Sequence, residues 1–468
     1  KEFQTTAYTP IFKYNVKYDN RDDGGYFMFT KGDRIFVEPE VPGGGTSTIP
    51  SGNPSDAFNP AVLSSPVAAQ AGANATMNQT FNYAFQNADN FMNIPYLERV
   101  AMKYENQYAL SPTGDATDVG TFSPLFTKQN TSSVWVKPYA SFENIPLKNG
   151  PKVSNITYGT LIGFDSEMQH LKRGWDRVWT GYIGYNGASQ RYSGVDSTQN
   201  GGLVGGTMTL YKGNFFNATT LSAGASVANN QTMYGNEDFA MLLAGIGNKT
   251  GYNFEFKNGR LILQPNMLIS YTFVNTFDYT NAAGVRIDSK PLNAIQLAPG
   301  VKVIANLEGG WQPYVGVNMV WNLLDKSNVH ANDVKLPEMS VKPYVQYGVG
   351  IQKRIKDKYM AFGQAMIQNG GRNGVSLTAG FRWALGKEGK PIEKVTTPQP
   401  RIGNAGQTGL VTRHFGQTVS DKKGGKLSAS QPGARKILKQ LTPEQRTALG
   451  GKSYGTTRTV NKGVLKQL

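Results

Sequence analysis

The chain has 468 residues with 54 glycines and no cysteine, and 17% of its residues are charged. Without cysteine there is no disulfide framework, thiolate metal site or cysteine nucleophile, and the three histidines are too scattered for a histidine metal cluster. We therefore expect no metal and no cofactor. No run approaches 18 apolar residues, so no transmembrane helix is predicted. Because initiating Met and signal peptide are both missing, we expect a mature or trimmed fragment.

Residues 1 to 65 are predicted to be a small strand-rich segment followed by a flexible linker. Aromatic and polar residues alternate from Phe12 to Tyr18, and a turn at 22 to 25 precedes a second apolar run at 26 to 29. The stretch from Pro42 to Pro54 is rich in Gly and Pro, which favours a linker. Such a segment is too small to be a complete catalytic domain.

A helix is predicted from about Pro66 to Met92. One of its sides is apolar at helical spacing and carries Met77, Phe81 and Phe85. Another side is lined by three asparagines, Asn74, Asn78 and Asn82. A helix of this length spans roughly 38 Å, enough to thread a barrel from rim to rim. The alternative is a surface helix packed on a sheet. A second helical stretch at 95 to 108 completes a predicted helix-and-connection unit at 66 to 110, and a linker follows at 111 to 133.

From residue 134 the chain alternates between apolar residues and small or polar ones, the pattern of β-strands with two different faces. Between Trp311 and Trp321, for instance, every odd position is apolar. Twelve strands are predicted in this way, at about 134–144, 156–166, 177–188, 201–212, 214–228, 239–256, 260–274, 294–306, 311–323, 341–355, 358–368 and 373–385.

The connections between these strands tend to alternate in length. Those at 212–214, 257–259, 307–310 and 356–357 are short, whereas 275–293 and 324–340 are long, and 167–176 is the exception among the short ones. Short turns at one rim and long loops at the other are typical of outer-membrane barrels. The expected fold is therefore all-β, a 12-stranded antiparallel transmembrane β-barrel at 134 to 386 with an α-helix in the lumen.

A β-sandwich also alternates its faces, but its polar face lies in water and is usually rich in Lys and Glu. Here that face is rich in Gly, Ser, Thr, Asn and Gln, which suits a confined wet lumen. Trp311 and Trp321 share the outward parity ten residues apart, which projects to about 25 Å along the membrane normal, the separation of two aromatic girdles. Together with Trp383 they are the predicted membrane girdle.

The inward parity predicts which side chains face the lumen and contact the helix or a passing chain: Lys137, Tyr139, Glu143, Asp165, Gln264, Lys302 and Arg382. A glycine-rich stretch from Gly245 to Gly251 lacks the spacing of a phosphate loop and lies within a strand, so no nucleotide site is predicted.

Residues 387 to 468 carry most of the positive charge. They contain 16 Lys and Arg against 4 Asp and Glu, a net +12 of the chain's +16, and few apolar residues. We expect a disordered basic tail that contacts the cell wall or another anionic envelope polymer, with an unstructured solvated extension as the alternative. Nucleic acid is not expected as a partner, because aromatic residues that would stack on bases are nearly absent.

Residues 66 to 386 resemble the C-terminal translocator domain of autotransporters, the type V secretion systems of Gram-negative bacteria. The order and spacing of six motifs carry the resemblance: Trp135 to Tyr139, Gly163 to Asp165, Gly181 to Tyr185, Leu263 to Pro265, Gln312 to Tyr314 and Leu377 to Trp383. The last strand is also similar to the signal read by the barrel assembly machinery, with polar and apolar residues alternating at Thr378, Gly380, Trp383 and Leu385.

The resemblance implies a pore that exports and anchors an N-terminal passenger, of which residues 1 to 65 would be a remnant. It implies the bacterial outer membrane, with the N-terminal side extracellular and the C-terminal tail periplasmic. Outer-membrane lipid, the assembly machinery and the passenger are the implied partners. The 82 residues after Gly386 depart from the family, whose chains normally stop at the last strand.

Two other functions remain open on the sequence: a porin-like channel with the helix as its plug, and an envelope anchor or adhesin whose tail binds the cell wall. No enzyme is expected. Some autotransporters do release their passenger when an asparagine of the helix attacks its own backbone with help from lumen acids. The candidates here are Asn74, Asn78, Asn82 and Asn87, with Glu143 and Asp165 as acids. A wet plug is the preferred reading of these asparagines.

Overall fold

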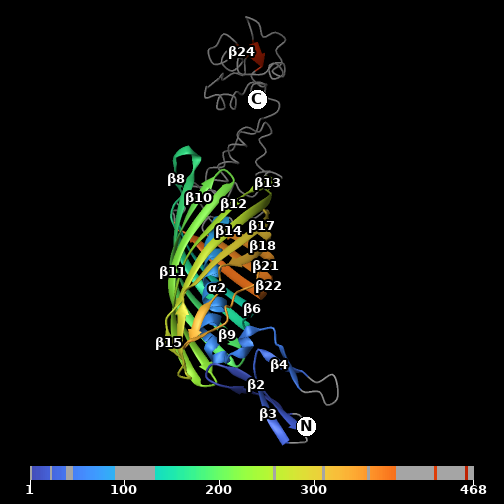
Figure 1. The fold of residues 1–468 in the computed structure, drawn as a ribbon. Helices are drawn as coiled ribbons and strands as arrows, with labels where there is room; N and C mark the ends of the chain where they lie inside the picture. The colour runs from blue at the N-terminus through green and yellow to red at the C-terminus, as the bar shows by residue number, and fades with distance from the viewer. Residues whose placement is uncertain are drawn as a thin grey trace. The chain divides into compact units, whose positions relative to one another are not determined.

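Twelve antiparallel strands close into a barrel (Figure 1). The computed structural model describes residues 3–21, 24–37, 46–89, 132–256, 260–307, 311–355, 359–385, 426–428 and 459–461. Each barrel strand pairs with the next, and the last, β23, pairs with the first, β6, which closes the barrel. The strands are β6 (Ser133–Pro146), β7 (Lys152–Asp165), β9 (Asp176–Tyr192), β10 (Val195–Lys212), β11 (Phe215–Thr232), β12 (Gly235–Tyr252), β14 (Leu261–Thr276), β17 (Leu292–Ala305), β18 (Trp311–Leu323), β21 (Tyr344–Ile355), β22 (Tyr359–Gly370) and β23 (Asn373–Ala384). The predicted 12-stranded barrel is confirmed.

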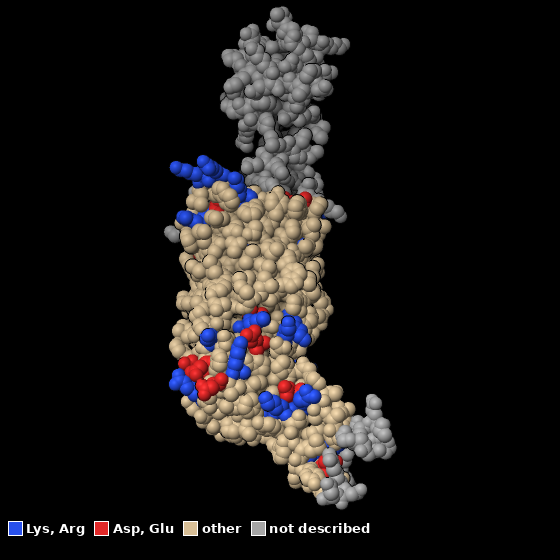
Figure 2. Space-filling model, viewed as in Figure 1, with Lys and Arg blue, Asp and Glu red and all other residues tan. Residues whose placement is uncertain are grey.

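Alternation decides which side of the wall each residue faces. In β18, Val315, Val317 and Met319 are exposed on the outside, while Tyr314 and Val320 are buried. An outward apolar surface of this kind is stable only against lipid, and closure leaves no unpaired strand edge there. Figure 2 shows the same wall from outside, with a broad band that carries almost no charged side chains.

The two ends of the barrel are named here by their connections. The C-side mouth is the end where β6 begins and β23 ends, and the N-side mouth is the opposite end. At the N-side mouth, β9 and β10 are joined only by Ser193 and Gly194, both with positive φ, and β11 and β12 only by residues 233–234. β9, β10 and β11 are longer than predicted, and β12 begins four residues earlier than predicted. Their outward residues become polar near the turn, as in the Arg191–Asp196 ion pair at 2.5 Å, so the apolar alternation ends before the strands do.

The two long connections at the N-side mouth form a sheet of their own. It contains β15 (Tyr279–Thr280), β16 (Arg286–Lys290), β19 (Asn328–Ala331) and β20 (Val334–Lys335) in that order. Long loops were predicted here correctly, but their pairing with each other was not foreseen. Each strand is short, and a sheet of this size is stable only when one face packs on a core.

Two small β elements precede the helix. The first is a three-stranded sheet of β1 (Gln4–Tyr8), β2 (Lys13–Arg21) and β3 (Gly24–Lys31), and the second is the pair β4 (Arg34–Val37) and β5 (Ser47–Pro50). Residues 47 to 50, which the sequence predicts as linker, are therefore a paired strand. Their β-branched Thr48 and Ile49 lie opposite Phe36 and Ile35, which favours pairing.

Helical structure begins earlier than the predicted residue 66. It runs through η1 (Pro54–Ala57), η2 (Pro60–Leu63), α1 (Ser64–Val67), the π-helical η3 (Ala68–Ala73) and α2 (Asn74–Asp89). Asn53 and Asn59 cap the first two turns by accepting from the backbone N–H of Ser55 and Ala61, and each is followed by proline. Asparagine caps with proline at the first helical position are a strong start signal.

The helix lies in the lumen. Almost every residue from Ala61 to Ala88 is buried, and α2 contacts β7, β11, β12 and β14 (Figure 1). None of the described helices is long and apolar enough to cross a membrane. The second predicted helix at 95–108, most of the predicted linker at 111–133 and nearly all of the tail lie outside the described residues. Of the tail, only β24 (Lys426–Ser428) and β25 (Thr459–Asn461) are described, and they pair with each other.

Candidate functional site: the lumen helix and its wall

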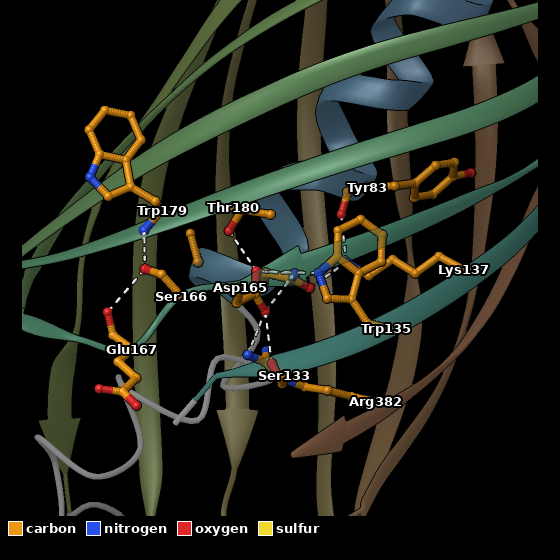
Figure 3. A network of polar contacts seen from close by, with 12 residues as sticks. Tyr83, Ser133, Trp135, Lys137, Asp165, Ser166, Glu167, Trp179, Thr180 and Arg382 are labelled. Atoms are coloured by element: carbon orange, nitrogen blue, oxygen red, sulfur yellow. Dashed lines mark hydrogen bonds and ion pairs between the residues drawn. The ribbon is translucent and has the colours of Figure 1, made fainter. Parts of the chain in front are cut away.

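A buried carboxylate, Asp165, organises the C-side half of the lumen (Figure 3). It lies at the end of β7, and its register partners are Ser133 on β6 and Thr180 on β9, so the three side chains share the inner face. Its oxygens accept hydrogen bonds from the Ser133 hydroxyl (3.2 Å), the Thr180 hydroxyl (2.6 Å) and the Trp135 indole N–H (3.2 Å). The carboxylate on β7 is thus held by donors from its two neighbouring strands, β6 and β9.

Two cations complete this network. The Arg382 guanidinium on β23 pairs with Asp165 at 2.5 Å, and neither side chain is exposed to solvent. The Lys137 ammonium on β6 donates to the Tyr83 carbonyl (2.7 Å) and to the Asn87 side-chain oxygen (2.6 Å), both on α2. Removing charges from water is costly, so a buried pair is stable only when its hydrogen bonds are well satisfied. The predicted lumen residues Lys137, Asp165 and Arg382 thus lie together around the end of the helix.

Asn87 joins the helix to the carboxylate as well as to the lysine. Its amide nitrogen lies 3.3 Å and 3.4 Å from the two Asp165 oxygens. Of the four asparagines considered for self-cleavage, Asn87 is the one with a described contact to a lumen carboxylate. The same contact, together with Lys137, holds the Asn87 side chain against the wall. The interpretation of these asparagines as a wet plug remains a prediction.

A second ion pair bridges the closing seam of the barrel, between β23 and β6, near the N-side mouth. Arg372, in the turn between β22 and β23, donates to Glu143 on β6 at 2.8 Å, and the Ser141 hydroxyl donates to the same carboxylate at 2.6 Å. Both charged side chains are buried. Between the two ion pairs the seam lacks regular pairing beside Pro138, where the Thr378 hydroxyl donates to the Pro138 carbonyl at 3.0 Å.

The helix packs against one side of the lumen. Phe81 and Phe85 are fully buried and lie against Gly245 and Gly247 of β12, where a side chain would leave no room for their rings. This is the structural role of part of the glycine-rich stretch in β12. Asn78 also touches this side, because its side-chain oxygen accepts from the Ser270 hydroxyl of β14 at 3.1 Å.

A polar cavity lies on the opposite side of α2. The helix contributes Asn74, Asn78 and Asn82, and the wall contributes Lys302 of β17 and mainly amide side chains of β17, β18, β21 and β22. Buried amide atoms of Gln79, Gln86, Asn322 and Gln368, which line it, have no partner in the described structure. Amides both donate and accept, so this wall suits water or an unfolded peptide without selecting a sequence.

An apolar plug closes the N-side mouth around the start of the helix. Val62, Leu63 and Val67 pack with Ile287 of β16 and Val329 of β19, in a cluster that also includes Ile145, Val153, Tyr192, Leu336 and Met339. The Ser65 and Ser289 hydroxyls are 2.7 Å apart, and the Gln70 amide donates to the carbonyls of Asp325 and Met339. Burial of each such aliphatic side chain is worth about 1.5–3 kcal/mol, so the loop sheet and helix stabilise each other.

The remaining predicted site residues take other positions. Tyr139 packs against Tyr83 with the rings tilted and their centroids 4.9 Å apart, and Gln264 donates to the Asn253 side chain at 2.7 Å on a different part of the wall. Trp311 and Trp383 are exposed at the C-side mouth and Trp321 is half-buried toward the N-side mouth. In the last strand Thr378 is buried, whereas Trp383 and Leu385 are exposed and Gly380 lies under the Phe362 ring.

Sequence reasoning missed several residues of the site. Ser133 and Trp135 share the inward parity of Lys137, and Thr180 lies opposite Asp165, so alternation held a signal for them. Arg372 lies in a turn, where alternation gives no direction. No group of His, Asp and Glu side chains suited to a metal ion occurs among the described residues.

Closed outward-apolar strands around a polar, helix-filled lumen define an outer-membrane β-barrel of the translocator class. A family model described as the autotransporter beta-domain matches residues 134–365, which covers the barrel from β6 into β22. The barrel belongs to this family, and its function is that of an outer-membrane autotransporter translocator, a transport barrel that exports a passenger N-terminal to it.

Among solved structures, the chain is similar to the transport unit of the autotransporter AIDA-I from Escherichia coli, with 18% identity, a TM-score of 0.48, and coverage of 54% of this chain and 90% of that one. It is also similar to the beta domain of the Bordetella autotransporter BrkA, with 19% identity, a TM-score of 0.45, and coverage of 54% and 99%. For the translocator domain of NalP from Neisseria meningitidis the values are 10%, 0.45, 61% and 96%. No curated protein matches the sequence.

Proposed function

We propose that α2 is the part of the exported chain that stays in the barrel, so that the passenger end is anchored at the N-side mouth on the cell surface. The observation that supports this proposal most is the double fixation of the helix. Its end is bound to the wall through Asn87, Lys137 and Asp165, and its start is enclosed by the apolar plug at the N-side mouth. An anchor needs such fixation, whereas a removable gate does not.

In this proposal the N-side mouth is extracellular and the C-side mouth periplasmic. Residues 1–65 are the end of the passenger, 66–110 the lumen helix and its connection, 111–133 a linker, 134–386 the barrel and 387–468 a periplasmic tail. The wall residues Lys137, Tyr139, Glu143, Asp165, Gln264, Lys302 and Arg382 hold the helix or contact the passing chain. Trp311, Trp321 and Trp383 form the girdle that contacts outer-membrane lipid.

The last strand acts in assembly in the same proposal. Its residues Thr378, Gly380, Trp383 and Leu385 are the signal that the barrel assembly machinery recognises, within the chain rather than at its end. The basic tail beyond them binds an anionic polymer of the cell wall by charge. Deleting residues 387–468 should leave the barrel inserted and weaken attachment of the protein to isolated cell wall. Unchanged attachment would remove the tail from the proposal.

The orientation is tested in intact Gram-negative cells that express the full chain with one epitope before Phe3 and another after Leu468. We expect antibody to label the first epitope on intact cells and the second only after the outer membrane is permeabilised. The opposite labelling would reject the orientation. The double variant Lys137→Met with Asn87→Leu loses the polar contacts that Lys137 and Asp165 make with the end of the helix. We expect it to leave the first epitope more accessible to added protease than the control variant Lys353→Met does.

A further inference from the structure

The connection between β7 and β9 departs from its neighbours at the C-side mouth. There β10 and β11 are joined by residues 213–214 alone, whereas residues 166–175 form a hairpin whose strand β8 (Gln169–His170) pairs with Asp176 and Arg177 of β9. Figure 1 shows β8 extending beyond the rim of the barrel. Strand β7 already pairs with β9 from Asp165 onward, so closure of the barrel does not require the hairpin.

The tip of the hairpin holds an arginine in an unfavourable backbone conformation. Residues Lys172–Gly174 form a single turn, η5, in which Arg173 has φ 62° and ψ 26° and Gly174 has φ 73°. Glycine adopts this left-handed region freely, but for other residues it costs roughly 1–2 kcal/mol. Lys172 and Arg173 are both exposed. A strained residue whose side chain has been placed in solvent points to a function outside the fold.

Two further cations at the same rim lie beside tryptophan rings, one exposed (Trp179) and one half-buried (Trp175). The Arg177 guanidinium is oriented by the Gln169 side-chain oxygen (2.6 Å from Nη2, 3.2 Å from Nε) and lies 5.6 Å from the centre of the Trp179 ring. The Lys212 ammonium of β10 lies 5.3 Å from the Trp175 ring. Trp175 in turn meets Phe215 edge-on at 6.2 Å. Hydrogen bonds and rings therefore fix where these charges are presented.

We call Lys172, Arg173, Arg177 and Lys212 the basic hairpin patch. Two carboxylates lie nearby, the exposed Glu167 and the buried Asp176, so the patch keeps a positive balance. Figure 2 shows blue side chains extending from the rim at this corner, directly above the band without charges. Trp179, on β9, is 46% exposed on the outside of the wall. The cations therefore begin where the surface suited to lipid tails ends.

We propose that the basic hairpin patch binds the phosphate groups of anionic phospholipids in the leaflet that surrounds the C-side mouth. Cations adjoining interfacial tryptophans reach phosphates while the rings lie at headgroup level. Lys172 and Arg173, which are exposed at the tip of the hairpin, extend this contact away from the wall. The planar guanidinium of Arg177 can donate two hydrogen bonds to two oxygens of one phosphate. The inference rests on the proposed function only in assuming that the barrel is inserted in a membrane.

The test uses the full chain purified in a neutral detergent and titrated with phosphatidylglycerol or phosphatidylcholine, with bound lipids counted by native mass spectrometry. We expect phosphatidylglycerol to bind more tightly. In the variant K172Q/R173N we expect its affinity to fall roughly tenfold or more, since each cation near an anionic lipid surface contributes about a fivefold factor. Asparagine tolerates the left-handed conformation, so the turn is kept. The control K326Q/K335Q removes two exposed cations from the N-side loops and should change affinity less than twofold.

Several outcomes would overturn the inference. The first is equal affinity for the two lipids. The second is an affinity for phosphatidylglycerol that is unchanged in K172Q/R173N. The third is a loss of that affinity in the control K326Q/K335Q that equals the loss in K172Q/R173N. Displacement of phosphatidylglycerol by millimolar inorganic phosphate would indicate a free-anion site, and stronger binding of lipid A at the patch would indicate the other leaflet. A heat-dependent shift in electrophoretic mobility shows that each variant is folded. Surface labelling of the N-terminal epitope tests the proposed function separately, and it should be the same in K172Q/R173N and the parent.

Discussion

Glycine and aromatic residues form matched pairs on neighbouring barrel strands. The Trp135 ring lies across Gly163, Tyr314 across Gly350 and Phe362 across Gly380, in positions that a Cβ atom would occupy. Aromatic rings that cover glycines restore contacts that the glycine lacks and allow the strand to bend. Gly380 therefore has a packing role that is independent of any part it plays in assembly.

At residue scale, Gly247 controls where the helix lies. A Cβ atom at this position would be 3.3 Å from both Phe81 and Phe85, so Gly247→Leu would displace the rings at a cost of about 1–3 kcal/mol. We expect faster proteolysis within α2 in bilayers and a folded barrel. Gly181→Leu is the matched control, since a Cβ there meets nothing within 4 Å. Equal proteolysis of the two variants would show that α2 does not depend on this wall.

Asp165 and Arg382 are expected to behave as one unit. Asp165→Asn leaves a buried guanidinium without its carboxylate, so the free energy of unfolding should fall by about 3–5 kcal/mol. Asp165→Asn with Arg382→Met should recover part of that loss, because no uncompensated charge remains. Urea unfolding in detergent micelles, followed by tryptophan fluorescence, measures the free energy of unfolding of these two variants and of the single variant Arg382→Met. If the double variant is as unstable as the sum of the two single variants, the pair is not coupled.

At the scale of elements, the loop sheet and the helix form one cluster from segments distant in sequence. The loops supply Ile287, Val329 and Met339, and the helix supplies Val62 and Leu63. Each loop strand has two to five residues, too short for its alternation to be read. The sequence therefore predicted the long connections but not their pairing, because the pairing depends on a surface that only the inserted helix provides.

Asp325, in the second of these loops, gives this cluster a pH dependence. Burial raises the pKa of its carboxyl, an effect partly opposed by the hydrogen bond from the Val341 N–H at 2.9 Å and by Lys148. A raised pKa means that the folded loop prefers the neutral acid. The contribution of Asp325 to stability is therefore highest below the ordinary pKa of aspartic acid and declines as pH rises through the raised value.

Asp325→Asn keeps an acceptor for Val341 and removes the charge. We expect the loops of the variant to gain stability relative to the parent between pH 4 and pH 7, as measured by hydrogen exchange of loop amides after correction for intrinsic rates. Half-buried Asp288 and Glu338 have pKa values lowered by hydrogen bonds from Arg286 and Lys335. Both are present in the variant and in the parent, so their contributions to the pH dependence cancel in the comparison. A difference that does not change with pH would contradict the assignment.

At the scale of the whole molecule, the helix and plug should keep the pore nearly closed. The full chain in planar bilayers is expected to conduct weakly through the polar cavity beside α2. A variant without residues 60–89 loses both the helix and its part of the plug, and its conductance should be roughly tenfold higher, as for a barrel with an open aqueous lumen. The variant Gly181→Leu keeps both the helix and the plug, so its conductance should equal that of the full chain and serves as the control. High conductance in the intact protein would favour the porin-like alternative.

The sequence by itself determined the barrel, its strand number and the inward or outward side of its residues. It does so because alternation has a period of two, and lipid and a wet lumen impose opposite demands on the two faces. Lys137, Asp165 and Arg382 were identified as lumen residues for that reason.

Only the tertiary structure decided which of them meet. Closure brings β23 beside β6, and thereby Arg382 beside Asp165, although 217 positions separate them in the chain. The position of the helix against β12, the plug made with the loop sheet and the basic hairpin patch depend in the same way on packing between distant segments. Local patterns carry no information about such contacts, because they exist only after the barrel has closed.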